Sequence, residues 1–390
     1  MKNRRFLKGH NRNLLLMSIL VCFAAVAYGQ VTPVATGLNN PRGLAFGPGG
    51  VLYVGEAGLG AGNGAGGVGL GVGFTGSVGE IRDLSSPHPT FTRIITSLAS
   101  SADAGGVVGP DGVSPLGNGN ISIIMAESTS ATQANHPNAP PALLEQFGRL
   151  LQASQSGHWK AVADVGDFDY AWAGQNANQP WAPKGQFPDA NPYAVLSLPG
   201  HQFVADAGSN TIDEVTENGS VRIIAFVPNP LLPFGPGGAL VPVSDSVPTC
   251  VAQGPDGFLY VGTLAFGANL ATGKAQSKIY RINPNSTSIF LTDADVWAAG
   301  FHPITGCGFG LDAFYVTEFF TAGFGTPGDV IRVAFNPDGS AGARTPMGVG
   351  ALIAPNGFAA GPDGSIYVSN FSVFPGVNAG PVGQVVRVDN

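Results

Sequence analysis

Apolar and polar residues alternate in short runs along most of this chain. The alternation is clearest in residues 40–54, 247–261 and 354–368, where an apolar run, a Gly-Pro turn and a second run ending in Tyr-Val follow one another. Alternation with a period of two predicts β-strands, and Pro-Asp-Gly or Pro-Gly-Gly steps predict tight turns. The three segments are therefore predicted to be copies of one unit made of a strand, a turn and a strand.

Weaker copies of this unit fill the gaps between the three clear ones. Aligning the chain on the apolar dipeptide after the turn gives six units, spaced 71, 79, 57, 55 and 52 residues apart: Tyr53-Val54, Ile124-Met125, Phe203-Val204, Tyr260-Val261, Tyr315-Val316 and Tyr367-Val368. A polar break and a second alternating run follow each dipeptide. Repeated units of about four strands predict propeller blades rather than solenoid turns. The predicted fold class is all-β, a six-bladed β-propeller.

The two ends of the repeat predict how the propeller closes. The sequence stops on the third strand of the last unit, residues 385–388, whereas residues 31–36 form a short run without a unit of their own. We expect this N-terminal strand to become the outer strand of the last blade, where it covers an exposed sheet edge. The pattern shows almost no helix, apart from one or two turns at residues 141–147.

Composition agrees with a turn-rich β protein. The chain has 58 glycines among 390 residues, 11% charged residues and 44% hydrophobic residues. Because regular strands accompany the glycine excess, the glycines are expected in turns rather than in a disordered segment. A propeller holds its core between blades, so residues 30–390 can form one domain.

Residues 1–29 have the features of a secretory signal peptide. Five basic residues precede or flank an apolar run at 14–27, and Ala-Tyr-Gly at 27–29 offers small residues for cleavage. A membrane anchor is the alternative, but the apolar run is shorter than the roughly 20 residues that a spanning helix needs. We therefore expect a secreted or periplasmic protein that has no stable membrane insertion after cleavage.

The charge of the chain limits its partners. The full sequence carries a formal charge of −7, and the signal segment holds basic residues but no acidic ones, so the remaining chain is more acidic still. Nucleic acid and anionic membranes are poor partners for such a surface. A small molecule or an extracytoplasmic protein is the expected partner.

Two cysteines, Cys250 and Cys307, lie in the first strands of neighbouring units. Their aligned positions differ by one residue, which places the two side chains on opposite faces of their strands. The sequence leaves open whether they form a disulfide or remain two buried thiols.

A polar residue recurs three positions after the aligned aromatic residue of each unit: Glu56, Glu127, Asp206, Thr263, Glu318 and Asn370. Equivalent positions in a radial repeat are expected to form a ring near one mouth of the central channel. Carboxylates that lie close together repel one another unless a cation, a basic partner or raised pKa values offset their charge. Ligand sets made of oxygen atoms favour Ca²⁺ or Mg²⁺. The alternative is that these residues accept hydrogen bonds from loop backbone or lie in water.

Another set of aligned residues begins the innermost strands. Asn356 occupies the place that Arg42, Asp111, Tyr193 and Thr249 have in other units. Together with Glu56 and Asp206, Asn356 is similar in position to the metal ligands of gluconolactonase-like propellers, which are lactone hydrolases. The alternative is that Asn356 is a turn residue of an Asn-Gly step.

The longer loop at residues 164–193 is rich in aromatic residues, among them Trp172, Trp181 and Tyr193. This composition suits a lid that stacks on a planar or sugar ligand, or a local apolar cluster that covers the edge of a blade. The sequence has no Gly-x-Ser-x-Gly, His-Glu-x-x-His or Cys-x-x-Cys-His motif, so nucleophilic and haem chemistry have no support.

The order of motifs over about three quarters of the chain resembles the ScyD/ScyE family of secreted propellers, which is related in outline to NHL-repeat proteins. The matching stretches are Phe-Thr-Gly-Ser-Val at 74–78, Phe-Gly-Arg-Leu at 147–150, Ala-Asp-Val at 163–165, Asn-Pro-Tyr-Ala at 191–194, Val-Ala-Asp-Ala-Gly-Ser-Asn-Thr at 204–211 and Val-Pro-Thr at 247–249. Family members commonly have Asn-Pro-Asp-Gly in the long loop, where this chain has Asn-Ala-Asn-Gln-Pro-Trp at 176–181. The resemblance implies a secreted six-bladed propeller.

Two functions follow as hypotheses. The first is a binding module without a demonstrable catalytic motif, which engages a ligand or protein at the channel mouth. Its candidate binding residues are Glu56, Glu127, Asp206, Glu318, Asn370, Trp172, Trp181 and Tyr193. The alternative is a hydrolase or lactonase that uses a divalent metal held by Glu56, Asp206 and Asn356.

Overall fold

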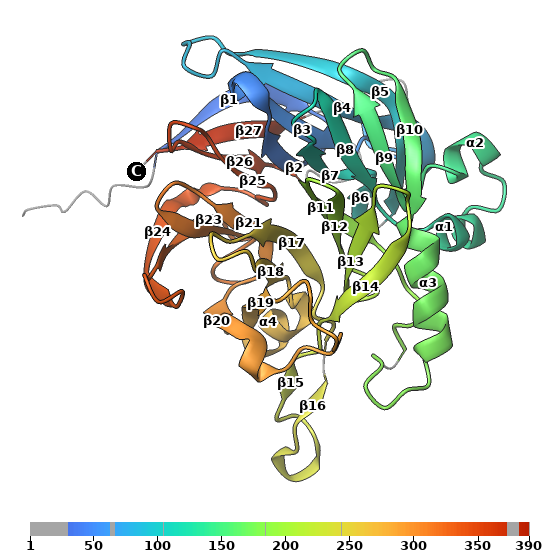
Figure 1. The fold of residues 1–390 in the computed structure, drawn as a ribbon, viewed down its shortest axis with the longest axis vertical. Coiled ribbons are helices and arrows are strands. Elements are labelled where there is room, and N and C mark those ends of the chain that lie inside the picture. The colour runs from blue at the N-terminus through green and yellow to red at the C-terminus, as the bar shows by residue number, and fades with distance from the viewer. Residues whose placement is uncertain are drawn as a thin grey trace, which may run out of the picture.

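The computed structural model describes residues 30–62, 67–103, 105–183, 185–242, 244–372 and 382–389. Its strands form six antiparallel sheets of four or five strands, arranged around a central axis (Figure 1). The predicted six-bladed β-propeller is confirmed. The expected signal peptide lies outside the described residues. Among the helices that the structure describes, none is long and apolar enough to cross a membrane.

Each blade runs from its innermost to its outermost strand in chain order, except where the N-terminal strand is added. Blade 1 contains β2 (Pro41–Phe46), β3 (Leu52–Glu56), β4 (Gly71–Arg82), β5 (Thr90–Asp103) and β6 (Gly106–Val108). Blade 2 contains β7 (Pro110–Pro115), β8 (Asn120–Met125), β9 (Arg149–Ser154) and β10 (Trp159–Asp164). Blade 3 contains β11 (Pro192–Leu198), β12 (His201–Asp206), β13 (Thr211–Thr216) and β14 (Val221–Phe226).

The second half of the chain repeats this arrangement. Blade 4 contains β17 (Pro248–Gln253), β18 (Leu259–Thr263), β19 (Ser277–Ile282) and β20 (Val296–Phe301). Blade 5 contains β21 (Ile304–Phe309), β22 (Ala313–Glu318), β23 (Gly328–Phe335) and β24 (Ala341–Leu352). Blade 6 contains β25 (Phe358–Ala360), β26 (Ile366–Asn370), β27 (Gly383–Val388) and β1 (Val31–Leu38).

The N-terminal strand closes the ring, as the sequence predicted. Strand β1 pairs with β27 in antiparallel register, with Val31 opposite Val388 and Leu38 opposite Gly383. Figure 1 shows β1 beside β27, close to the C-terminus. This pairing supplies hydrogen-bond partners to the edge of β27.

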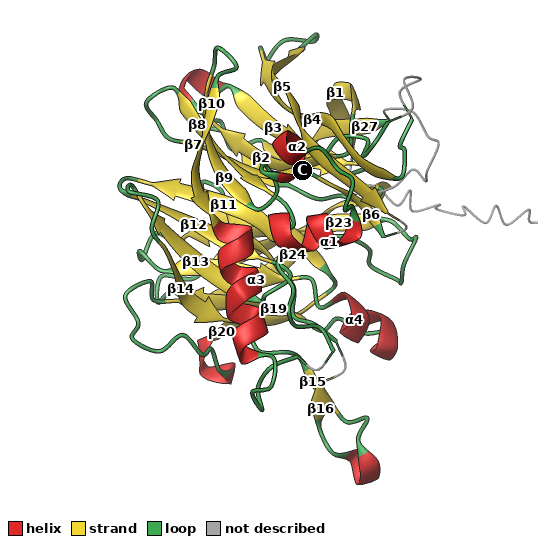
Figure 2. Ribbon diagram, turned by 90° about the vertical axis from the view of Figure 1, so that its right-hand side faces the viewer, coloured by secondary structure: helices red, strands yellow, loops and turns green. Residues whose placement is uncertain are grey.

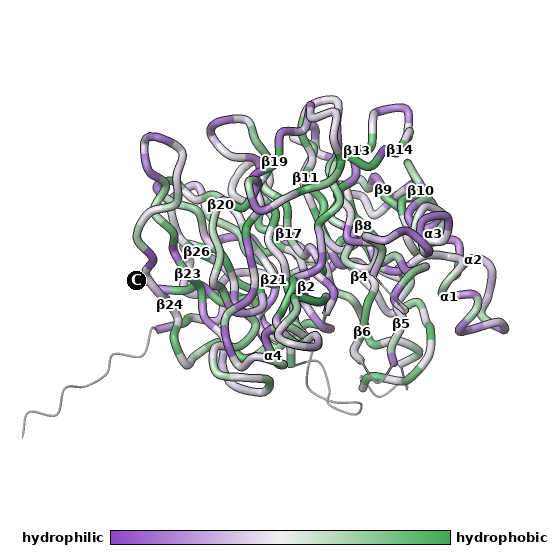
Figure 3. The backbone as a smooth tube through the Cα atoms, turned by 90° about the horizontal axis from the view of Figure 1, so that it is seen from below, coloured by the Kyte–Doolittle hydropathy of each residue, from purple (hydrophilic) through white to green (hydrophobic). Residues whose placement is uncertain are grey.

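The hydrophobic core lies between the blades, and the period-two alternation of each strand explains why. Tyr53 of β3 packs with residues of blade 2, whereas its neighbours Leu52 and Val54 pack with residues of blade 6. One apolar cluster of this kind fills each of the six contacts between neighbouring blades. In Figure 3, hydrophobic colour follows the strands, and hydrophilic colour is frequent in the loops that project from them.

Several glycines allow the innermost strands to approach one another. A β-carbon on Gly357 would lie 2.3 Å from the carbonyl oxygen of Arg42, and one on Gly306 would lie 2.4 Å from that of Asn356. A β-carbon on Gly43 would lie 2.8 Å from the carbonyl oxygen of Asp111. Part of the glycine excess thus serves close packing around the channel as well as turns.

The prediction that helices are almost absent was wrong, although the expected turns at 141–147 are present as α2 (Pro141–Leu144). The structure also has α1 (Thr129–Asn135), α3 (Val165–Asn176) and α4 (Phe266–Thr272) (Figure 2). Helix α3 lies within the segment that we had expected to be a loop. Its residues show no apolar stripe, but Asp164 caps its first turn by accepting a hydrogen bond from the Asp167 amide at 3.1 Å.

Short elements complete the connections. A hairpin of β15 (Leu231–Leu232) and β16 (Val241–Pro242) projects from the propeller between blades 3 and 4 (Figure 1). The 3₁₀ turns are η1 (Pro48–Gly50), η2 (Pro236–Gly238) and η3 (Asp293–Asp295).

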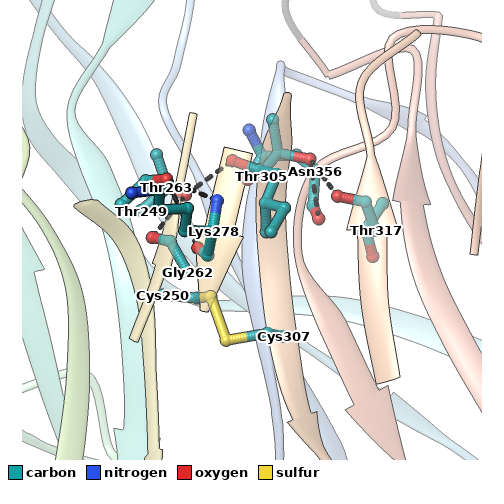
Figure 4. The surroundings of a disulfide bond; sticks show 10 residues. Thr249, Cys250, Gly262, Thr263, Lys278, Thr305, Cys307, Thr317 and Asn356 are labelled. Carbon is teal, nitrogen blue, oxygen red and sulfur yellow. Dashed lines mark hydrogen bonds between the residues drawn. A yellow bond between two sulfur atoms is a disulfide. The ribbon is translucent and has the colours of Figure 1, made fainter. Parts of the chain in front are cut away.

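The structure joins Cys250 and Cys307 in a disulfide, with their Cα atoms 5.6 Å apart (Figure 4). The one-residue offset between them is what such a bridge requires, because the two strands belong to different blades. Cys250 lies on the face of β17 that packs against blade 5, and Cys307 lies on the face of β21 that packs against blade 4. Side chains on opposite faces of their own strands therefore meet between the blades.

Candidate functional site

The innermost strands place one side chain from each blade around one end of the channel. The six residues are Arg42, Asp111, Tyr193, Thr249, Thr305 and Asn356, which all lie at or next to the start of an innermost strand. We call them the channel ring. Each ring residue except Tyr193 is buried. The ring forms because a radial repeat carries equivalent strand positions to equivalent places.

Hydrogen bonds within the channel ring link neighbouring blades. The Thr249 hydroxyl donates to the carbonyl oxygen of Ile304 at 2.6 Å, and the Thr305 hydroxyl donates to that of Pro355 at 2.9 Å. The side-chain amide of Asn356 donates to the hydroxyl of Tyr193 across the channel. These hydrogen bonds connect the ring residues to other blades and make the ring a polar floor of the channel.

Arg42 and Asp111 form the charged part of this floor. The Arg42 Nε lies 3.8 Å from Asp111 Oδ1, and a second guanidinium nitrogen donates to the carbonyl of Val107. Within the described part of the chain, Arg42 Nε and Asp111 Oδ2 have no hydrogen-bond partner. Burial raises the pKa of Asp111 to about 6, although the neighbouring Arg42 charge lowers it. Of these two residues, Arg42 lines the cavity described next, so its side chain brings a buried donor without a partner to the floor.

A cavity of about 440 Å³ lies above the ring. Its floor includes Arg42, Tyr193 and Asn356, and one wall is apolar. In that wall Phe266 of α4 packs 5.6 Å from Phe324 and 6.4 Å from Phe319, measured between ring centroids. This size and this mixture of an apolar wall with a few polar groups are typical of a small-molecule site.

Two non-glycine residues of the rim have left-handed backbone conformations. Val247 has a φ of 56° and Glu127 a φ of 62°. Both line the cavity, and Asn side chains hold both: Val247 N donates to Asn210 Oδ1 and Glu127 N donates to Asn191 Oδ1, each at 3.0 Å. A β-branched residue such as Val247 is costly in this region, so the hydrogen bond to Asn210 helps to hold the strand entry in place.

Most of the recurring polar residues bind the backbone of their own blade. Glu56 accepts a hydrogen bond from Asn39 N at 2.7 Å, Asp206 from Asn191 N at 2.8 Å, Glu318 from His302 N at 2.8 Å and Asn370 from Ile353 N at 2.7 Å. Each donor lies in the segment that leads into the innermost strand. The polar residues thus recur for a structural reason. In each of these blades, a side-chain acceptor at the end of the second strand accepts a hydrogen bond from a backbone amide just before the innermost strand.

The structure does not gather Glu56, Asp206 and Asn356 in one set of contacts. Both carboxylate oxygens of Glu56 accept hydrogen bonds at 2.7 Å from Arg93, inside blade 1, and Asn356 donates to Tyr193. Over the described ranges, no group of three or more His, Cys, Asp or Glu is arranged to hold a metal ion. Of the candidate binding residues, Glu127 and Tyr193 line the cavity.

The aromatic residues of the long loop pack beside blade 3. Trp172 stacks on Trp181 with ring centroids 5.6 Å apart, and Trp181 packs 4.9 Å from Phe226 and 5.1 Å from Phe290. These contacts form a local apolar cluster over the outer strand of the blade. Neither tryptophan is among the residues that line the cavity at the channel mouth.

Sequence reasoning missed several cavity residues. Arg42 was visible in the alignment of innermost strands but was not singled out as a binding residue. Phe266 and Phe319 follow the second strands of blades 4 and 5, where the repeat alone does not distinguish a rim residue from a core residue. Their position in the wall depends on α4 and on the connection after β22, which the period-two pattern does not predict.

Comparisons with known proteins agree with this architecture. No family model matches the chain, and no curated protein matches it. A putative oxidoreductase (glucose dehydrogenase) from Thermus thermophilus superimposes with a TM-score of 0.54 at 16% identity, covering 92% of this chain and 99% of that one. The PQQ-bound form of aldose sugar dehydrogenase from Streptomyces coelicolor superimposes with a TM-score of 0.52 at 14% identity, covering 93% and 98%. The shared feature is the fold.

Proposed function

We propose that this protein is a binding propeller that takes a small ligand into the cavity above the channel ring. A polar end of the ligand rests on Arg42 and Asn356, and an apolar part packs against Phe266 and Phe319. The fold hosts unrelated activities, so this proposal rests on the cavity and not on the names of the similar structures.

The observation that carries the proposal is the buried Arg42 Nε, which has no acceptor among the described residues and belongs to a side chain that lines the cavity. An unpaired buried donor costs about 1–3 kcal/mol, and more when it is charged. A ligand oxygen placed on the floor would remove this cost, so the cavity favours a ligand with a hydrogen-bond acceptor at one end.

We also propose that the protein is exported and belongs to the ScyD/ScyE-like propellers. The order of motifs supports the family, and the apolar segment at 14–27 supports export. The Cys250–Cys307 disulfide adds support, since disulfides persist mainly in oxidising compartments. Cell fractionation of the natural host checks the location: the chain is expected in the periplasm or medium with a mature N-terminus near residue 30.

The binding proposal is tested with a named probe, 1-anilinonaphthalene-8-sulfonate, which joins an aromatic body to an anionic acceptor. We expect saturable binding of about one dye per chain, followed by fluorescence. Phe266→Ala removes part of the wall and should weaken dye affinity by about tenfold, which corresponds to about 1.4 kcal/mol.

Leu311→Ala is the matched control, because Leu311 is an apolar side chain that is 74% exposed and lies outside the cavity lining. This variant should bind the dye as the wild type does. Equal loss in both variants, or no saturable binding by the wild type, would contradict the proposal.

A further inference from the structure

Blade 2 departs from the repeat where it faces blade 3. In every blade, one residue of the second strand lies opposite the residue that follows a channel-ring residue by three positions. Strand register identifies these six residues as Tyr53, Ser122, Phe203, Tyr260, Tyr315 and Tyr367. Five are aromatic and pack into the core shared with the next blade. Ser122 is the exception. The sequence alignment had assigned Ile124 to this position, because blade 2 lacks the aromatic residue that marks it.

Blade 3 departs from the repeat on the side that faces blade 2. Gln202 of β12 lies on the same face of its strand as Val204, which belongs to the core between blades 2 and 3. At the equivalent position, directly before the residue aligned above, the other five blades have Leu52, Ile121, Leu259, Phe314 and Ile366. The contact between blades 2 and 3 is therefore polar on both sides, where the others are apolar.

A third polar residue completes this departure. Gln152 of β9 is paired with Ser122 across the sheet of blade 2. The corresponding residues of the other blades are all charged: Glu80, Glu214, Arg281, Arg332 and Arg387. At this one contact between blades, both the aromatic ring and the charge are replaced by neutral polar groups.

A cavity of about 550 Å³ lies where these residues meet, and Ser122, Gln152 and Gln202 all line it. We call it the interblade recess. Blades 2 and 3 lie one above the other in Figure 2. The recess is bordered by the turns from β7 to β8 and from β11 to β12, at the opposite ends of these strands from Glu127 and Asn191, which line the cavity above the channel ring. The two cavities are thus separate.

The polar side chains of the recess have no protein partner. Ser122 and Gln202 are 3% and 8% exposed. Within the described residues, the side chains of Ser122, Gln152 and Gln202 form no hydrogen bond. Their polar atoms are also not among the fully enclosed atoms that lack a partner, so they reach the open space of the recess. Buried polar groups normally have a hydrogen-bond partner, and here a bound molecule must supply it.

The charges at the recess favour a neutral ligand. Its charged lining residues are Lys160 on blade 2 and Glu217 on blade 3, which are both exposed and have opposite signs. Leu150 and Leu198 add apolar surface between the polar groups. A carboxamide presents donors and an acceptor together, and a serine hydroxyl does both with one atom. Neighbouring sugar hydroxyls, which each donate and accept, match this set.

We propose that the interblade recess is a second binding site, which takes a neutral saccharide. Sugar hydroxyls bond to Ser122, Gln152 and Gln202, and the carbon face of the ring packs against the leucines. The volume of the recess lies within the roughly 300–1,000 Å³ that small-molecule sites occupy. This site is separate from ligand binding above the channel ring and does not rest on it.

The test is calorimetric titration of the mature protein with each of three neutral disaccharides: cellobiose, maltose and lactose. We expect saturable binding of at least one of them, at about one molecule per chain. Ser122→Tyr restores the residue type found in four other blades and places its ring in the recess, so it should weaken binding by more than about tenfold. Gln202→Leu, which also restores the repeat, should weaken binding as well. Both variants should fold and melt no lower than the wild type.

Ser85→Tyr is the matched control, because Ser85 is an exposed serine in the turn between β4 and β5. It should bind the disaccharide as the wild type does, and so should Phe266→Ala, which changes only the other cavity. No saturable binding of any of the three disaccharides by the wild type, or binding that survives both Ser122→Tyr and Gln202→Leu, would overturn the proposal. Binding of tetraalanine but of no disaccharide would assign the recess to peptides and also overturn it.

Discussion

At the residue scale, equivalent positions of the repeat serve different purposes. The channel ring differs in nearly every blade, whereas the next residue is glycine in four blades, namely Gly43, Gly112, Gly306 and Gly357. The glycines leave space for the neighbouring strand, so the adjacent ring positions are free to vary. The side chains of the channel ring can therefore differ in charge and polarity without a change in how the blades pack.

The close approach at Gly357 leads to the first prediction. Gly357→Ala should lower the free energy of unfolding by about 1–3 kcal/mol, because the new methyl group would overlap the Arg42 carbonyl. Urea unfolding measures the change. Gly174→Ala is the matched control: it lies in α3 with its nearest neighbour atom at 3.7 Å, and should be neutral or stabilising. Equal destabilisation by both changes would contradict the packing argument.

A second residue-scale prediction concerns Glu318 and Asp329, which are buried together in blade 5. Burial and the charge of Asp329 raise the pKa of Glu318 to about 8, and burial raises the pKa of Asp329 to about 6. The amide of His302 and the charge of Arg344 act in the opposite direction on Glu318. Because both pKa values lie above those of the unfolded chain, which are about 4 to 4.5, the folded state is most favoured below pH 4 and loses stability as pH rises from about 4 to 8.

In the Glu318→Gln variant, stability should decrease less as pH rises. Melting temperatures measured from pH 5 to 9 test this expectation. Asp338→Asn is the control, since Asp338 is exposed and the hydrogen bond from Ser340 lowers its pKa. A pH profile of Glu318→Gln that runs parallel to the wild-type profile would exclude the pair as the source.

At the element scale, the strands could be predicted from the sequence, but α3 and the disulfide could not. Residues such as Tyr53 and Val54 alternate because each strand faces two neighbouring blades, and this pattern is visible along the chain. Helix α3 has glycines at 166 and 174 and no apolar stripe, because its contacts with blade 3 include the buried polar Asp169. The disulfide depends on which faces of β17 and β21 meet, which a linear alignment does not show.

The disulfide should stabilise the contact between blades 4 and 5. The double variant Cys250→Ala with Cys307→Ala is expected to lower the free energy of unfolding by about 2–4 kcal/mol, because the bridge closes a long loop of the unfolded chain. Urea unfolding measures this loss, and reduction of the wild type with dithiothreitol should reproduce it. A reduced wild type as stable as the oxidised protein would show that the bridge adds no stability.

At the scale of the whole molecule, six interblade cores and the β1–β27 pairing form a closed ring around a polar channel. Repeat spacing and the missing outer strand were sufficient to predict this architecture. The cavity was harder to predict from the sequence, because its walls come from segments outside the repeat: Phe266 on α4, Phe319 after β22 and Val107 in β6. Only Glu127, Tyr193 and Asn356 among the predicted functional residues line it.

The most direct measurement is a crystal structure of the mature protein soaked with 1-anilinonaphthalene-8-sulfonate. The binding account predicts density for the dye above the channel ring, with the aromatic body against Phe266 and the sulfonate within hydrogen-bond distance of Arg42. Dye bound only at the surface, for example at the projecting β15–β16 hairpin, or a cavity that holds no dye at saturating concentration, would contradict the account.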